Sequence, residues 1–261
     1  ATDVGRMILE QGGNAVDAAV AAQFALAVVY PEAGNIGGGG FMMIHLADGR
    51  DTAVDFREKA PGAATRDMYL DSAGAADPAL SRDGALSAGV PGTVAGLELA
   101  HRLFGKLPMR VLIQPAIALA RGGFALTQAG AEHLNAAADA FGRYNTVPTA
   151  LTRPGGWKTG DTLVQPDLAR TLRRISDSGR AGFYQGETAH LIVSEMRRSH
   201  GLISLGDLAG YRAVLRSPIR FSYHDYTVVS MPPPSICGIL RVQMLGMASN
   251  YPLASYGFES V

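Results

Sequence analysis

A run of four glycines followed by two apolar segments constrains this chain more than any other feature. Gly37–Gly40 precede the apolar segment Phe41–Leu46, and Asp48-Gly49 separates that segment from a second one, Thr52–Phe56. Asp-Gly between two alternating apolar segments is a strong signal for a β-hairpin. A two-residue loop at Asp48-Gly49 predicts the pairs Ala47–Arg50, Ile44–Ala53, Phe41–Phe56 and Gly40–Arg57.

The same hairpin would place a cation beside backbone that carries no side chains. Alternation along the second strand puts Thr52, Val54 and Phe56 on one face and Ala53, Asp55 and Arg57 on the other. Arg57 would then end the strand opposite the glycines, where its guanidinium has the geometry to bind a carboxylate. By spacing alone, an ion pair between Arg57 and Asp55 or Glu58 is the favoured alternative.

The segment Ala15–Val29 is predicted to be a buried helix, because its only polar residues are Asp17 and Gln23. Asn14 is a good N-cap, and Asp17 is placed to complete a capping box. At 1.5 Å per residue the helix would span about 22 Å, which is shorter than a membrane requires. We therefore expect a core helix, ended by Pro31, and no membrane contact from this chain.

Helical patterns and antiparallel hairpin signals are mixed along the rest of the chain. Helices are predicted at Val4–Gln11, Thr65–Leu70, Val94–Phe104, Met109–Ala120, Leu126–Ala140, Gln165–Ser178, Glu187–His200 and Leu240–Ala248, with a surface loop over Tyr144–Gly160. Strands are predicted at Ala213–Leu215, Ile219–Tyr223 and Tyr226–Met231. This order favours an α+β fold, with helices over an antiparallel sheet. A length of 261 residues suits one large domain or two small ones.

Charge and motifs exclude several classes of function. A formal net charge of +0 argues against nucleic acid or an anionic membrane as the partner. The six histidines lack metal-ligand spacing, and neither His-Glu-x-x-His nor Gly-x-Ser-x-Gly occurs. The glycine run follows a helix and precedes a strand, the reverse of a phosphate-binding loop. Cys237 lacks a neighbouring His or Lys, which predicts a buried, inert thiol.

Seven motifs span nearly the whole chain. They are Asn14-Ala-Val-Asp-Ala-Ala-Val-Ala, Pro31-Glu-Ala-Gly-Asn-Ile-Gly-Gly-Gly-Gly-Phe, Asp55-Phe-Arg-Glu-Lys-Ala-Pro, Gly89-Val-Pro-Gly-Thr-Val-Ala-Gly, Gly160-Asp-Thr-Leu-Val-Gln, Phe183-Tyr-Gln-Gly and Met231-Pro-Pro-Pro-Ser. In this order they resemble the large subunit of γ-glutamyltransferases (γ-glutamyltranspeptidases). Each motif alone is weakly specific, but the set is highly specific.

The resemblance implies an α+β fold, the four-layer αββα sandwich of N-terminal-nucleophile hydrolases. Residues 1–261 would form an incomplete large subunit without a separate second domain. The resemblance also implies that Arg57 holds the α-carboxylate of a γ-glutamyl group, such as that of glutathione. From the residues themselves, Glu58 either orients the guanidinium or is a solvated acid at the rim, and Gly40 would leave space beside Arg57. No metal, no organic cofactor and no catalytic residue of this chain is implied, and the family is expected to be periplasmic or secreted.

The chain also departs from the family pattern. Ile236 and Cys237 stand where the family commonly has a serine and a glycine, which puts a local turn in doubt. The family's nucleophile is a threonine that becomes the N-terminus of a small subunit after self-cleavage, with its own α-amine as the base. Its Thr-Thr-His segment is absent here. The implied partner is therefore that small subunit, and we expect this chain alone to be inactive.

The sequence further suggests a piece of a longer protein. Ala1-Thr-Asp-Val-Gly reads as the middle of a helical segment, no signal peptide is visible, and Val261 falls before the usual end of a large subunit. Three alternatives stay open. They are a cephalosporin- or glutaryl-acylase-like relative, a capsule depolymerase-like transpeptidase, and a non-catalytic binding remnant.

Overall fold

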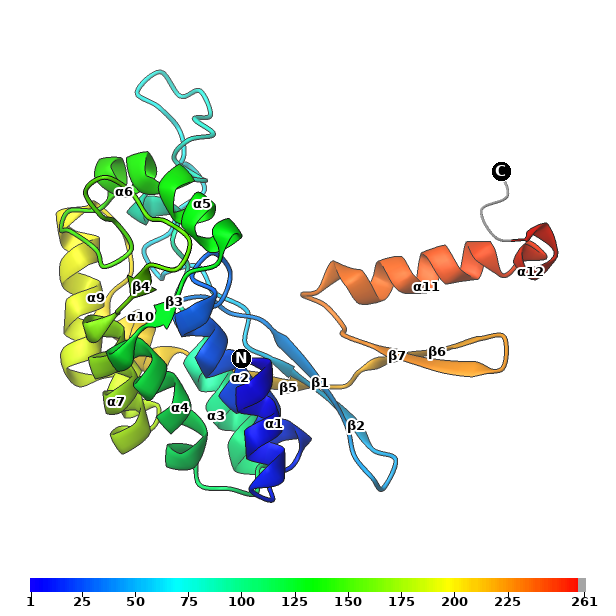
Figure 1. The fold of residues 1–261 in the computed structure, drawn as a ribbon. Coiled ribbons are helices and arrows are strands. Elements are labelled where there is room, and N and C mark those ends of the chain that lie inside the picture. Colours follow the sequence, from blue (N-terminus) through cyan, green and yellow to red (C-terminus); the bar gives the residue numbers. More distant parts are fainter. Residues whose placement is uncertain (258–261) are drawn as a thin grey trace.

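A computed structural model describes residues 1–257, in which a layer of helices covers one face of a three-stranded antiparallel sheet (Figure 1). The sheet has the order β1-β2-β5, with β1 at Phe41–His45, β2 at Asp51–Asp55 and β5 at Val214–Arg216. The helical layer contains α1 (Thr2–Glu10), α2 (Ala15–Val29), α3 (Thr93–Phe104), α4 (Met109–Gly122), α7 (Pro166–Ser178), α8 (Ala181–Tyr184), α9 (Gly186–Arg198) and α10 (Leu205–Gly210). The expected α+β class is therefore confirmed.

Helix α2 lies at the centre of the helical layer, packed against α1, α3 and α4. Its side chains Val20, Phe24 and Val28 are fully buried in one continuous core, which explains why the segment is apolar all round. Asn14 and Asp17 form the predicted capping box, with both hydrogen bonds at 3.0 Å. The bounds of α2 match the prediction.

The β1–β2 hairpin differs from its predicted register by one residue. Phe41 pairs with Asp55, and Ile44 pairs with Thr52. The cause is the loop, because Leu46 N–H donates to the Arg50 carbonyl at 2.9 Å and encloses three residues rather than two. Gly49 takes a φ of +81°, which is typical of a three-residue loop that ends in a left-handed residue. The pairs predicted for Ala47, Ile44, Phe41 and Gly40 are therefore wrong.

The shift moves the glycine run relative to the end of β2. Gly40 pairs with Phe56, since Phe56 N–H donates to the Gly40 carbonyl at 3.0 Å, and Gly40 does not face Arg57. The predicted alternation of faces is unaffected, because it depends on β2 alone. Val54 and Phe56 both point into the helical core.

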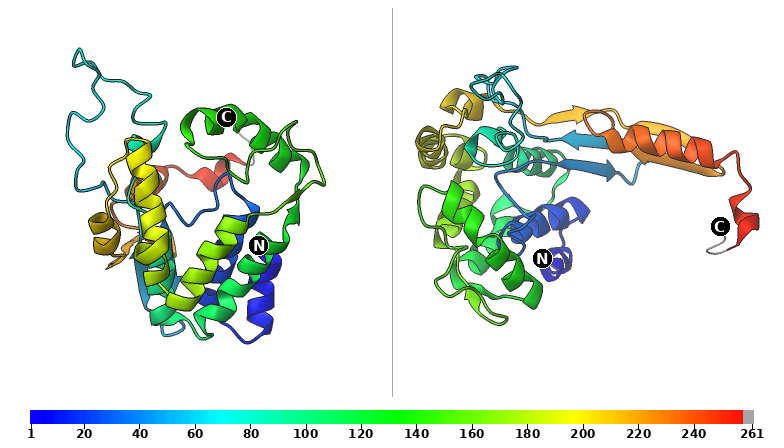
Figure 2. Two further views of the ribbon diagram at one scale, coloured as in Figure 1. Left: turned by 90° about the vertical axis from the view of Figure 1, so that its left-hand side faces the viewer. Right: turned by 90° about the horizontal axis from the view of Figure 1, so that it is seen from above.

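Three further parts of the described chain lie outside this sheet and its helical layer. Near α5 (Gln128–Ala136) and α6 (Ala138–Tyr144), the short strands β3 (Phe124–Ala125) and β4 (Thr162–Leu163) pair. A 3-10 helix, η1 (Ala85–Ser87), lies in the long connection before α3. The C-terminal arm comprises β6 (Ile219–Tyr223), β7 (Tyr226–Ser230), α11 (Ile236–Ala248) and α12 (Leu253–Tyr256), and it projects away from the helical body (Figures 1 and 2).

Several predicted helices change in the structure. Thr65–Leu70 forms turns, and the helix predicted at Leu126–Ala140 is divided into α5 and α6. The helix predicted at Leu240–Ala248 is α11, which begins four residues earlier at Ile236, so Ile236 and Cys237 occupy its first turn without a positive φ. Cys237 is exposed, so the buried thiol was a wrong prediction. Across residues 1–257, helices fall short of the length and hydropathy that a membrane span needs.

Candidate functional site

Arg57 lies just beyond the end of β2, and hydrogen bonds hold its backbone on both sides. Its N–H donates to Asp55 Oδ1 at 3.0 Å. Its carbonyl accepts the hydroxyl of Tyr211 at 2.8 Å, across 154 residues of sequence. The Cα of Arg57 is therefore fixed both by the sheet and by the segment that follows α10.

The Arg57 side chain is 59% exposed and makes an ion pair with its neighbour, with Nε 3.2 Å from Glu58 Oε2. Asp55, the other predicted partner, instead binds Arg216 of β5 at 2.7 Å. An exposed pair such as Arg57–Glu58 adds little to stability, because solvent screens it. In this pair the Glu58 carboxylate holds the guanidinium of Arg57, which stays accessible to an anionic group.

The glycine run packs more tightly than the predicted open recess. A Cβ added at Gly39 would lie 2.5 Å from the Phe56 carbonyl oxygen and 2.8 Å from Glu58 Oε2. The Gly38 carbonyl accepts N–H groups from Gly92 and Thr93 at the start of α3, at 2.7 and 3.0 Å. The glycines therefore let three backbone segments meet beside Arg57, and of the four only Gly37 has open space around its Cα.

Tyr211 is a site residue that sequence reasoning missed, because no local pattern connects it with Arg57. Its ring stacks on Tyr184, with centroids 5.8 Å apart, and Lys59 Nζ lies 5.2 Å from its centroid. Burial, reinforced by the charges of Asp55 and Glu58, raises the pKa of the Tyr211 hydroxyl above its ordinary value. Tyr211 is thus a protonated donor to the Arg57 carbonyl at neutral pH.

These residues can recognise an anion, but they do not assemble a reaction centre. Arg57 has no acceptor or nucleophile role, since a guanidinium only donates. Within residues 1–257, no group of three or more His, Cys, Asp or Glu side chains could hold a metal ion. The arrangement presents an exposed guanidinium with N–H donors of the kind that suit a carboxylate.

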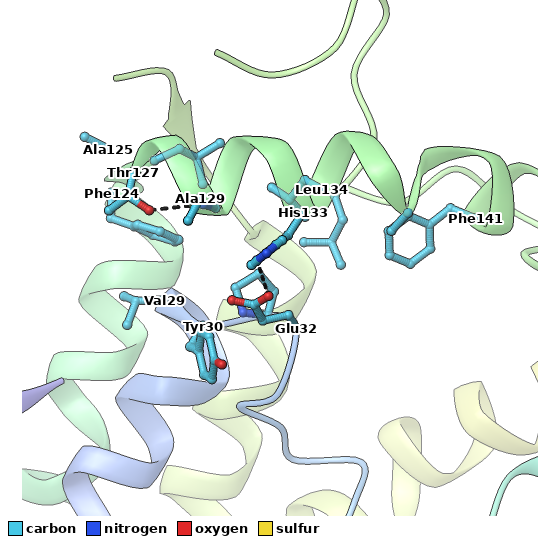
Figure 3. A pocket seen from close by; sticks show the side chains of 15 residues that line it. Val29, Tyr30, Glu32, Phe124, Ala125, Thr127, Ala129, His133, Leu134 and Phe141 are labelled. Atoms are coloured by element: carbon cyan, nitrogen blue, oxygen red, sulfur yellow. Dashed lines mark hydrogen bonds and ion pairs between the residues drawn. The ribbon is translucent and has the colours of Figure 1, made fainter. Parts of the chain in front are cut away.

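A cavity of about 500 Å³ lies elsewhere, between the C-terminal end of α2 and helix α5 (Figure 3). Apolar side chains such as Phe124, Leu134 and Phe141 line it, and a Glu32–His133 ion pair crosses it. Its lining includes neither Arg57 nor the residues predicted to support it. The cavity is therefore separate from the predicted carboxylate site.

Comparison with known proteins extends over the whole chain. The family model described as Gamma-glutamyltranspeptidase matches residues 1–261. The chain is 47% identical over 262 residues to the glutathione hydrolase proenzyme of Escherichia coli (strain K12), covering 100% of this chain and 45% of that protein. It is 40% identical over 270 residues to the acylase ACY 1 proenzyme of Pseudomonas sp. (strain SE83), covering 100% of this chain and 48% of that protein.

The fold gives the same assignment. The crystal structure of Helicobacter pylori γ-glutamyltranspeptidase matches with a TM-score of 0.96 and 47% identity, over 99% of this chain and 74% of that one. This match confirms the expected class of N-terminal-nucleophile hydrolase folds, of which the described residues supply a helical layer and part of a sheet. The chain spans less than half the length of the curated relatives named above. It belongs to the γ-glutamyltranspeptidase family.

Proposed function

We propose that the complete protein transfers or hydrolyses the γ-glutamyl group of glutathione and other γ-glutamyl compounds. A threonine at the N-terminus of a small subunit attacks the γ-amide, and the C–N bond breaks to release the protonated amine and leave an acyl-enzyme. Water, an amino acid or a peptide then takes the γ-glutamyl group and frees the threonine. Residues 1–261 contribute part of a single large-subunit domain that binds the donor. The protein acts in the periplasm or outside the cell, and this chain alone is inactive.

The observation that carries the proposal is the state of Arg57. Its backbone is held by Asp55 and Tyr211, while its guanidinium stays more than half exposed with Glu58 as its ion-pair partner. A fixed, accessible guanidinium suits the α-carboxylate of the γ-glutamyl group, which it can bind with two parallel hydrogen bonds. Glu58 orients the guanidinium, and Gly40 belongs to the backbone that packs behind it through Phe56.

Substitution of Arg57 in the complete protein tests this role. Arg57→Ala should raise KM for γ-glutamyl-p-nitroanilide and lower kcat/KM about thirtyfold, as expected for losing about 2 kcal/mol of charge-assisted binding. Self-cleavage should continue, because the side chain is not needed to fold β2. Arg57→Lys should recover part of the loss, since it keeps the charge but not the bidentate geometry.

Arg50→Ala provides the matched control. Arg50 is an exposed arginine next to the loop of the same hairpin, and it pairs with Asp48 as Arg57 pairs with Glu58. We expect its KM to match that of the unsubstituted protein. An unchanged KM for Arg57→Ala would show that the guanidinium does not bind the donor.

The identity to an acylase proenzyme makes glutaryl substrates the second candidate. A glutaryl group keeps the distal carboxylate and lacks only the α-amine of a γ-glutamyl group, so Arg57 suits the carboxylate of either donor. We expect kcat/KM for γ-glutamyl-p-nitroanilide to exceed that for glutaryl-p-nitroanilide, and Arg57→Ala to lower both values; a higher value for the glutaryl compound would favour the acylase. Mass spectrometry of the purified protein separates both activities from a non-catalytic remnant, because the enzyme requires a second, Thr-initiated chain.

A further inference from the structure

A small polar pocket of about 330 Å³ lies on a different face of α3 from the one that contacts β2. Glu98 and Arg102 of α3 line it together with Arg180, which precedes α8, and Arg212, which follows α10. Gly92 and Gly96 mark the other face, where a Cβ would collide with the backbone or ring of Phe56. The pocket is therefore distinct from the Arg57 site.

Positive charge in this pocket is poorly compensated. Arg180 Nη2 and Arg212 Nη1 both donate to the carbonyls of Ala209 and Tyr211, and the two bonds to Ala209 measure 3.1 and 2.7 Å. Those carbonyls are neutral, so within residues 1–257 two like charges share the same acceptors without an ion pair, and the centroid of the Tyr184 ring lies 4.7 Å from Arg180 Cζ. Glu98 accepts the backbone N–H of Arg180 at 3.3 Å and lies in no ion pair among the described side chains.

Three further observations show the same imbalance. Arg180 Nε is buried and has no hydrogen-bond partner among the described residues. Burial, reinforced by the charge of Arg212, lowers the pKa of the Arg180 guanidinium. Arg102 is exposed at the pocket, and within residues 1–257 its side chain makes no ion pair or hydrogen bond. Three cations and one carboxylate leave the pocket with a formal charge of +2.

We propose that this pocket binds a small oxyanion of the phosphate type, as free phosphate or as the phosphate group of a small monoester. A dianion would neutralise the pocket, and planar guanidinium groups match phosphate oxygens with paired N–H donors. The volume lies at the lower end of the range for small-molecule sites. The inference does not depend on the proposed γ-glutamyl chemistry.

A purely structural role for the arginines makes a different prediction. Arg180 and Arg212 would then serve only to satisfy the carbonyls at the end of α10, and Arg102 would have no role. With arginines in that role, the pocket would show no saturable binding of an anion. Arg102 is therefore the side chain to substitute, because its exposed position leaves the fold intact.

The test is calorimetric titration of the complete protein with inorganic phosphate and, separately, with phenyl phosphate, at constant ionic strength in chloride. We expect one saturable site that sulfate competes for and chloride does not. Arg102→Gln should weaken binding about tenfold. Glu98→Gln, which keeps an acceptor oxygen for the Arg180 N–H, should tighten it. Tighter binding of phenyl phosphate indicates a monoester ligand, and equal or weaker binding indicates free phosphate.

Two controls make the result specific. Arg197→Gln removes the same charge from an exposed position on α9, and Arg57→Ala removes the other proposed anion-binding group; neither should change the affinity for phosphate. The proposal is overturned if no saturable binding occurs. It is equally overturned if Arg197→Gln weakens binding as much as Arg102→Gln, or if Arg57→Ala abolishes it.

Discussion

At the scale of single residues, Arg57 combines a rigid backbone with an accessible charge. Tyr211 donates to its carbonyl, and Tyr184 stacks on Tyr211 while donating to the Pro91 carbonyl at 2.8 Å. Two buried tyrosines thus connect the end of β2 with the helices α3, α8 and α10. Their hydroxyls act as donors only while they stay protonated.

This pair of tyrosines gives the protein an alkaline limit to its stability. Burial raises the pKa of Tyr184 and of Tyr211 above the ordinary value, which an unfolded chain retains. The stabilising contribution is therefore complete below about pH 10 and is lost as pH rises above it, because the unfolded state releases its protons first. We expect the melting temperature of the complete protein to fall steeply above about pH 10.

Phenylalanine substitutions separate this effect from general alkaline denaturation. Tyr184→Phe and Tyr211→Phe should each lower the melting temperature at neutral pH and make its alkaline decline shallower. Tyr144→Phe, on the exposed helix α6, is the matched control and should leave the slope unchanged. An identical alkaline slope in all variants would mean that the two buried hydroxyls do not control it.

At the scale of elements, the N-terminus of α2 is a polar connection inside an apolar layer. Asp17 is fully buried, and its carboxylate accepts the N–H groups of Asn14, Lys106 and Leu107 at 3.0 to 3.2 Å. It therefore caps its own helix and fixes the turn between α3 and α4. Asn14 adds a bond to the Phe104 carbonyl at 2.6 Å.

Alanine substitutions should show which of Asp17 and Asn14 contributes more to the free energy of unfolding. Asp17→Ala leaves several buried N–H groups unpaired and should lower the free energy of unfolding by about 3 kcal/mol. Asn14→Ala should cost about 1 kcal/mol, the usual value for an N-cap. Asp3→Ala, an exposed acid in the first turn of α1, is the control with an effect near zero. Thermal or denaturant unfolding of the complete protein measures the order, and equal losses for Asp17→Ala and Asp3→Ala would contradict it.

At the scale of the whole molecule, the C-terminal arm carries apolar side chains that the described residues do not cover. Met244 and Met247 of α11 are each 62% exposed, and Tyr226 of β7 is 74% exposed. Large apolar side chains exposed together on one arm are typical of a contact with another part of a protein. Since the chain spans 45% of its E. coli relative, we expect the remainder of the complete protein to cover the arm.

Hydrogen exchange can test that expectation. Amides of β6, β7 and α11 should exchange more slowly in the complete protein than in residues 1–261 produced alone, because packing reduces local opening. The amides of α2, already buried by α1 and α4, serve as the internal reference and should be protected in both. Equal exchange of the arm in the two samples would show that it remains a free surface.

The sequence by itself determined α2, its cap, the α+β class and the position of Arg57 at the end of a strand. Each follows from short-range chemistry, such as a capping pair three residues apart or alternation along one strand. The exposure of Cys237 was mispredicted, because burial depends on which elements cover a helix. The roles of Arg57, Glu58 and Gly40 in substrate binding stay predictions.

Only the tertiary structure decided the rest. The hairpin register depended on whether the loop that contains Gly49 has two or three residues, and Asp-Gly suits both lengths. The contact of Tyr211 with Arg57 and the meeting of Arg102, Arg180 and Arg212 join residues far apart in sequence. Local patterns carry no information on such distant pairs, because packing of the helical layer alone brings them together.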